Sequence, residues 1–294
     1  MHRGVLRSSI CAAAMADACV FRRRFDGRAR SIDVYHNPLL DGGGTWLAEP
    51  FVQLLRRERR NLGTVFEFCA GPGFIAFALL ADGLAHAAVL ADVNPIAVEC
   101  ARKTVRENQL SDRVRVHLAN GTRGLPASER GRFDTVVTDW PNYEHFQGTF
   151  RRFFSALDDG DLRGEDPGWR LHREFYSGIR KFLAPGARMY IEEVRPMDRL
   201  VHHCVIRSTD GVWVRSKEPC DERSAAPLPL FASMIADGGL RLIQTLPWVD
   251  ERSRLVPAHR REGLREAVSW ILVVAAAEPA RRRGAAVLVE GPNL

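Results

Sequence analysis

The sequence predicts an α/β fold in which a mostly parallel sheet carries helices on both faces. Three observations predict it: short apolar runs alternate with longer helix-like segments, a glycine-containing turn follows the run at 65–68, and an acid, Asp92, follows the run at 87–91. Parallel strands need long crossovers, so the alternation indicates strand–helix–strand units. A chain of 294 residues is long enough for one large domain of this kind with additions.

The expected elements follow in a regular order. A helix is expected at 47–60, after a flexible turn at 39–46, and strands are expected at 65–68, 87–91, 114–118 and 135–138. Helices are expected at 74–81 and 95–108; Asn94 can cap the second of these, and Pro95 suits its first turn. A helix at 170–182, a strand at 188–192 and two late strands at 240–245 and 269–276 complete the pattern.

The domain organisation follows from these elements. Residues 1–60 are expected to form an N-terminal extension and a cap or lid segment, of which the Arg-rich first 30 residues read as a frayed extension. Residues 61–280 form the main domain, and 281–294 a tail. Two stretches, 143–169 and 196–229, exceed ordinary connections and read equally as substrate lids or as surface insertions, with a short strand at 212–214.

The turn after the first core strand has the residues of a nucleotide-binding loop. Gly71 and Gly73 allow the backbone to approach a ligand closely, and the following helix offers free N–H groups at its positive end. Asp92, nineteen residues beyond Gly73, lies where a ribose meets its carboxylate acceptor. Taken alone, the glycines are also consistent with an ordinary strand-to-helix turn.

A third feature gives the chain a family resemblance. The strand at 133–138 ends in Asp139-Trp140-Pro141-Asn142-Tyr143. With the glycine turn and Asp92, this order resembles the class I S-adenosylmethionine (SAM) methyltransferases, in the "small domain" group with an (Asn/Asp)-Pro-Pro-(aromatic) motif, over about residues 33–277. The resemblance implies a Rossmann-like, seven-stranded sheet whose last two strands form an antiparallel pair. It also implies SAM as cofactor and S-adenosylhomocysteine as product.

The resemblance assigns cofactor-binding residues. Cys69 stands at the first glycine position of the motif, and Glu67 is expected to accept a hydrogen bond from a water or from the SAM amino group. Asp92 is expected to take both ribose hydroxyls, and Asn120 the adenine edge. The complete expected set is Glu67, Cys69, Ala70, Gly71, Gly73, Asp92, Val93, Asn120, Gly121 and Asp139, with Thr45 from the preceding turn.

The same resemblance assigns acceptor residues: Asp139, Trp140, Asn142 and Tyr143. Methyl transfer needs a neutral, aligned nitrogen, so positioning supplies much of the rate. The Asp139 carboxylate and the Trp140 carbonyl can each accept an N–H bond, and the carboxylate also stabilises positive charge on the nitrogen. Trp140 replaces the first Pro of the motif, and Asn142 occupies its aromatic position. These departures favour a flexible amine or guanidine over a flat nucleobase.

The sequence therefore favours an N-methyltransferase for a small amine or guanidine metabolite in specialised biosynthesis. Three alternatives stay open: methylation of protein glutamine or arginine or of RNA, O-methylation of a small acceptor, and SAM binding without catalysis. In the O-methylation alternative, His145 or His172 would serve as general base. Further candidates for acid–base or anchoring roles are Glu144, Glu192 and Glu193.

Composition narrows the partners and the compartment. The net charge of +6 is spread along the chain and concentrated in both tails, which argues against nucleic acid as the partner. Apolar runs stay shorter than a membrane span, and the six cysteines form no CxxC pair or zinc-ligand spacing. We expect no metal, no membrane contact, reduced thiols and a cytoplasmic location. The oligomeric state is left open, a homodimer included.

Overall fold

The computed structural model describes residues 21–37, 48–58, 61–141, 166–194, 200–207, 213–220, 228–248 and 269–277. Its centre is a seven-stranded sheet in the order β10-β11-β7-β6-β3-β4-β5. These strands are β3 (Thr64–Phe68), β4 (Ala87–Asp92), β5 (Val114–Leu118), β6 (Phe133–Thr138), β7 (Leu183–Val194), β10 (Leu240–Pro247) and β11 (Ser269–Ala276). Strands β3 to β7 pair in parallel, and β11 is antiparallel to both neighbours, so the predicted fold class is confirmed.

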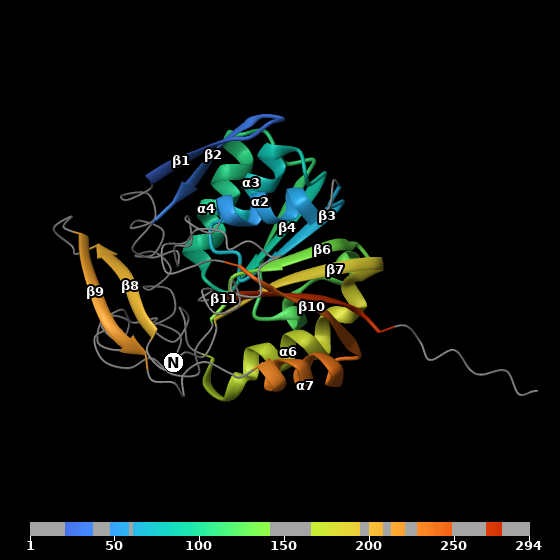
Figure 1. The fold of residues 1–294 in the computed structure, drawn as a ribbon. Helices are drawn as coiled ribbons and strands as arrows, with labels where there is room; N and C mark the ends of the chain where they lie inside the picture. The colour runs from blue at the N-terminus through green and yellow to red at the C-terminus, as the bar shows by residue number, and fades with distance from the viewer. Residues whose placement is uncertain are drawn as a thin grey trace, which may run out of the picture.

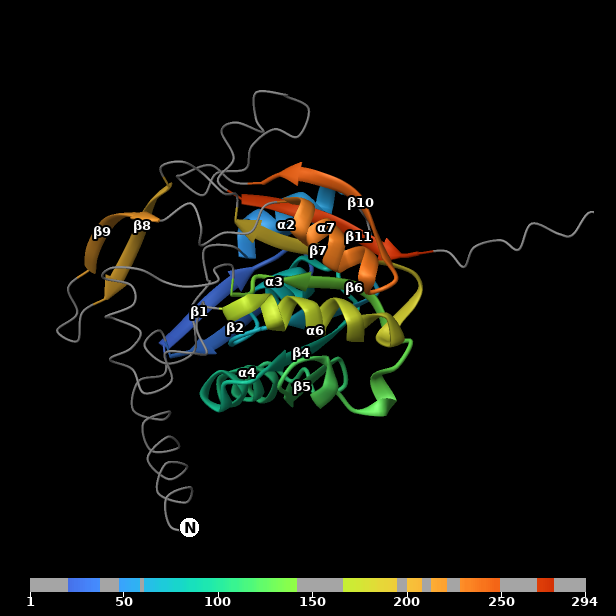
Figure 2. The same cartoon turned by 90° about the horizontal axis from the view of Figure 1, so that it is seen from below.

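Helices cover both faces of the sheet (Figure 1; Figure 2). On one face lie α2 (Ala48–Glu58), α3 (Phe74–Asp82) and α4 (Pro95–Glu107); on the other lie α6 (Arg170–Ile179) and α7 (Leu228–Asp237). Side chains alternate along each strand, so Val65 packs with the first set of helices and Phe66 with the second. Helix α3 is buried on every side, which explains its almost wholly apolar sequence.

Element boundaries follow the sequence pattern closely, with a few differences. The side chain of Asn94 accepts a hydrogen bond from the Ile96 N–H at 3.0 Å, so the predicted cap of α4 is confirmed. The expected helix at 170–182 divides into α6 and a 3₁₀ turn at Arg180–Phe182. Strand β7 begins at Leu183, earlier than expected, and includes the expected turn: Gly186 has a φ of 76°, and the pairing with β6 shifts register there.

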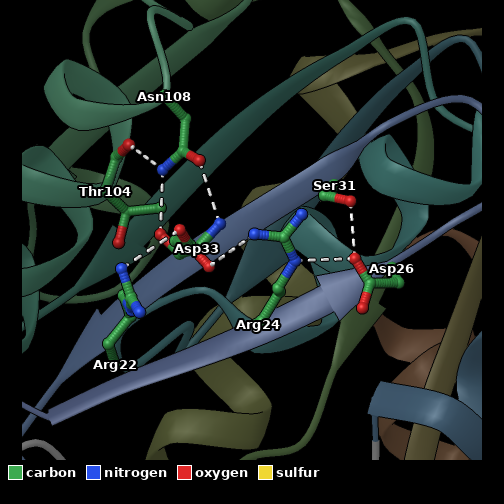
Figure 3. A network of polar contacts seen from close by, with 7 residues as sticks. All are labelled: Arg22, Arg24, Asp26, Ser31, Asp33, Thr104 and Asn108. Carbon is green, nitrogen blue, oxygen red and sulfur yellow. Dashed lines mark hydrogen bonds and ion pairs between the residues drawn. The ribbon is translucent and has the colours of Figure 1, made fainter.

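An N-terminal hairpin corrects the expectation of a frayed extension for residues 21–30. Strands β1 (Phe21–Asp26) and β2 (Ser31–His36) pair antiparallel, and Ile32 and Val34 are fully buried. Asn108, just after α4, exchanges two hydrogen bonds with the backbone of Asp33, at 2.9 and 2.8 Å (Figure 3). Apolar alternation in β2 and this amide bridge hold the hairpin on α3 and α4. Residues 1–20 lie outside the described residues.

A second hairpin lies within the expected insertion at 196–229. Strands β8 (Leu200–Arg207) and β9 (Trp213–Cys220) pair antiparallel as a separate two-stranded sheet, and the strand expected at 212–214 is the start of β9. Helix α7 begins at the end of the same stretch and was not expected. The remainder of this insertion, the stretch 142–165 of the other, and the tail at 281–294 lie outside the described residues. Among the described helices, none has the length and apolar character that crossing a membrane requires.

Candidate active site

The sheet topology brings the predicted site residues to one edge. The chain passes from β3 to β4 and β5 on one side, and then crosses to β6 on the other side of β3. Ligands of open α/β sheets bind at such a reversal, outside the carboxyl ends of the strands. Glu67 near the end of β3, Asp92 at the end of β4 and Asp139 after β6 share this edge.

The turn between β3 and α3 needs its glycines. Cys69, Gly71 and Gly73 all have positive φ, at 52°, 52° and 89°. A Cβ atom on Gly73 would lie 2.7 Å from the Leu90 side chain and 2.9 Å from that of Phe77. Cys69 adopts the left-handed conformation without being glycine, which costs about 1 kcal/mol. The turn therefore depends on left-handed backbone at three positions and on the small size of Gly73, which lets it pack against Leu90 and Phe77.

Glu67 lies beneath this turn and is 4% exposed. Its carboxyl oxygens accept hydrogen bonds from the N–H groups of Ile75 at 3.3 Å and Ala76 at 2.7 Å, in the first turn of α3. Burial raises the pKa of Glu67 to about 8, the two amide bonds oppose the rise, and the charges of Asp139 and Asp92 add to it. In the structure Glu67 thus caps the first turn of α3. Its expected contact with the SAM amino group stays a prediction.

Asp92 is fixed by backbone amides on both sides. Its carboxyl accepts from the Gly71 N–H at 2.7 Å through one oxygen and from the Asn94 N–H at 2.8 Å through the other. The carboxyl group is thus oriented both by the glycine turn and by the residue that caps α4. The Ala119 N–H donates to the Asp92 carbonyl at 2.9 Å, which brings the start of the 119–121 segment beside it. There Asn120 is exposed and Gly121 buried, while Val93 is half-buried.

Asp139 and Trp140 follow β6 but serve opposite sides of the sheet. Burial raises the pKa of Asp139 to about 7, and its charge in turn raises the pKa of Glu67, which caps α3. The Trp140 side chain is 3% exposed and packs in the apolar cluster under α6 and α7. Adjacent residues of the motif thus present a carboxyl on the α3 side and an anchor on the other.

The Trp140 side chain packs against a buried polar cluster of Asp166, His172 and Glu193, each at most 3% exposed. His172 Nδ1 lies 2.6 Å from Asp166, and Nε2 lies 3.4 Å from Glu193. His172 and Glu193 were among the residues expected from the sequence, whereas Asp166 was not. Its signal was an acid before Pro167 and a helix start, because the Asp166 carboxyl accepts from the N–H groups of Leu171 and His172.

Comparison with known proteins identifies the fold and the activity. Residues 31–156 match the family model described as Methyltransferase small domain. Over this segment the chain is similar to methyltransferase small domains. This match includes the glycine turn, Asp92 and Asp139, and it assigns SAM-dependent methyl transfer as the activity and SAM as the cofactor.

Solved structures resemble the methyltransferase at low identity. A Pyrococcus horikoshii protein described as a transferase has 13% identity and a TM-score of 0.50, with 87% of this chain and 71% of that chain covered. A SAM-dependent methyltransferase of Aquifex aeolicus has 16% identity and a TM-score of 0.47, with 80% and 94% covered. The first similarity supports the fold alone. A search of curated proteins found no sequence match.

The residues present fit SAM. The Asp92 carboxyl is held by the Gly71 and Asn94 amides at the end of β4, where an open α/β sheet places its ribose-binding acid. Among the described residues, no group of His, Cys, Asp or Glu has the arrangement of a metal site. Glu192 is 4% exposed at the end of β7. The other expected residues, Thr45, Asn142, Tyr143, Glu144 and His145, lie outside the described part of the chain.

Proposed function

We propose that the methyltransferase transfers the SAM methyl group to the nitrogen of a small amine or guanidine metabolite, in a specialised biosynthetic pathway. The supporting observation is the concentration of carboxyl groups at the sheet reversal. The charges that raise the pKa of Glu67 come from Asp139 and Asp92, and both are negative. Such a site favours a cationic cofactor and an acceptor whose nitrogen becomes positive.

The roles of the residues follow from their positions. When bound, SAM supplies an electrophilic methyl group. Asp92 holds the ribose hydroxyls, and the amides of the glycine turn face the cofactor. Asp139 accepts an N–H from the acceptor, together with the Trp140 carbonyl, and so directs the nitrogen lone pair. Because the pKa of Asp139 is about 7, its carboxylate can also take the proton that an ammonium acceptor must lose before attack.

Two observations favour this proposal over its alternatives. Arginines of the β1–β2 hairpin have partners within the chain: Arg22 pairs with Asp33 at 3.6 Å and Arg24 with Asp26 at 2.8 Å, which lowers their value as an RNA-binding surface (Figure 3). His172 is fully buried, so it does not suit a base that touches an O-methylation acceptor.

We further propose a cytoplasmic location, supported by the free thiols of Cys69 and Cys100.

The experiment offers methyl-labelled SAM with three acceptor pools: small amines and guanidines, bulk protein, and RNA. We expect label in the first pool. Asp139→Ala should abolish transfer while the affinity for S-adenosylhomocysteine, which lacks the positive charge, stays within about tenfold, and Asp112→Ala, a change at an exposed acid, should leave transfer intact. Label in protein or RNA would refute the acceptor class. Full activity of Asp139→Ala would refute the assigned role of Asp139.

A further inference from the structure

The Asp166–His172–Glu193 cluster is a buried histidine held between two acids. Asp166 precedes α6, His172 lies in its first turn, and Glu193 lies near the carboxyl end of β7. The Tyr176 hydroxyl also donates to Glu193, at 3.4 Å. Three ionisable groups in an apolar core are costly unless they pair with one another. The mechanism above uses none of them.

The charges in the cluster depend on one another. Burial would raise the pKa of Asp166, but its bonds from His172 and two backbone amides outweigh burial and lower it. Burial would lower the pKa of His172, but Glu193 and Asp166 outweigh burial and raise it. Burial raises the pKa of Glu193 against the opposing effects of His172, Tyr176 and Trp140. The pKa of Asp166 is thus lowered, whereas the pKa values of His172 and Glu193 are both raised, so the protonation of each group depends on its neighbours.

Trp140 is the cluster's contact with the acceptor motif. The centroid of its ring lies 3.9 Å from that of His172, and Phe68, Phe175 and Tyr176 surround it edge-on. Its Nε1 forms no hydrogen bond of good geometry among the described residues, but it lowers the pKa of Glu193 and so lies near that carboxyl. The indole is therefore enclosed on its ring face by the imidazole and at its N–H by the acid.

This contact acts on the backbone that carries Asp139. Trp140 has no ring closure to fix its φ, as a proline at the same position would have. Its position after β6 is held instead by the burial of the indole. Movement of the His172 ring would therefore move the indole. Trp140 carries both this indole and the carbonyl assigned to the acceptor, and the preceding residue carries the Asp139 carboxyl.

We propose that His172, clamped by Asp166 and Glu193, is a positioning residue that fixes the Trp140 indole and thereby the acceptor-facing atoms of residues 139–140. The link to the acceptor rests on the proposed function, whereas the clamp on Trp140 is independent of it. His172 and Glu193 belong to α6 and β7, so the clamp joins the acceptor motif to two elements of the core.

The test compares His172→Gln and Glu193→Gln with His117→Gln. His117 is a matched control, because it also pairs with a buried acid, Glu129, at 3.0 Å. The chain has six tryptophans, so the indole N–H signals of ¹⁵N-labelled protein are few, and Trp140→Phe identifies the signal of Trp140. Measurement of this signal requires no methyl acceptor. Cofactor affinity is measured by titration with S-adenosylhomocysteine, and turnover with whichever pool accepts the label.

We expect the Trp140 signal to shift or broaden in both cluster variants and to keep its position in His117→Gln. In wild type it should also move with pH as the contact between His172 and Glu193 titrates; Asp166, Tyr176 and Trp140 are the other groups that face this pair. Cofactor affinity should stay within about twofold while kcat falls about tenfold or more. An unchanged Trp140 signal in both variants, or affinity falling in parallel with kcat, would overturn the proposal. If no pool accepts the label, the proposed function fails, but the signal still decides the clamp.

Discussion

The raised pKa of Asp139 makes a specific prediction about how pH separates SAM from S-adenosylhomocysteine. The two molecules share adenosine and amino-acid groups and differ in the methylated, positively charged sulfur of SAM. In the empty protein, burial holds the pKa of Asp139 at about 7. A cation bound beside this carboxyl favours its ionised form, so SAM binding releases a proton and SAM affinity rises with pH up to that pKa.

The magnitude follows from the pKa. A ligand that requires the ionised carboxyl loses affinity by a factor of one plus ten to the power of pKa minus pH, which is about 30-fold at pH 5.5 and about twofold at pH 7. The first factor corresponds to about 2 kcal/mol. Glu67, whose pKa is about 8, adds to the effect in the same direction. The affinity ratio of SAM to S-adenosylhomocysteine should therefore rise at least about 15-fold between pH 5.5 and 7.

Isothermal titration at several pH values, in buffers that differ in ionisation enthalpy, measures both the ratio and the released protons. Asp139→Asn should flatten most of the rise, and Asp112→Asn, which changes an exposed acid, should leave it unchanged. A ratio that stays constant from pH 5.5 to 8.5 in the wild type would refute the argument. It would place the Asp139 carboxyl outside the field of the sulfonium.

Three further predictions concern stability and binding. Cys69→Gly removes a left-handed non-glycine residue, φ 52°, and should raise the free energy of unfolding by about 1 kcal/mol in urea melts; a decrease would show that the thiol packs favourably. Asp92→Asn places an amide NH₂ against the Gly71 or Asn94 N–H and should weaken S-adenosylhomocysteine binding about 10–100-fold in titrations, unlike Asp112→Asn. Asn108→Ala deletes both bonds to the Asp33 backbone and should lower the free energy of unfolding by about 1–3 kcal/mol; a parallel loss of cofactor affinity would contradict its purely structural role.

The core of the fold was predictable because each signal was local. Strands β3 to β6 appear as apolar runs, and the start of α4 is marked by the capping residue Asn94 and by Pro95 in the first turn. The β1–β2 hairpin was missed because its stabilising contacts are long-range: the Asp33 backbone meets Asn108, 75 residues away. Strand β1 was also difficult to predict because most of its side chains are exposed and three of them are arginines, so its sequence lacks the apolar pattern of a buried strand.

The site divides in the same way. Asp92 and Asp139 were recognisable because each ends a strand of a parallel sheet, where ligands bind. The hydrogen-bond partners of Glu67 were not recognisable, because nothing in the local sequence shows that its carboxyl reaches the Ile75 and Ala76 amides. Pairing of His172 with Asp166 and Glu193 depends on how α6 packs on β7, which the sequence pattern does not encode.

The β1–β2 hairpin also determines where the molecule can be cut. The family match begins at residue 31, the first residue of β2, and so divides the hairpin at its turn. A protein trimmed to that boundary would lose β1 and the contacts of Ala29 and Arg30 with the Ala81 carbonyl at the end of α3. It would also expose the unpaired edge of β2, a strand that can then pair with other chains. Fragments intended to be well behaved in solution should therefore begin before Phe21.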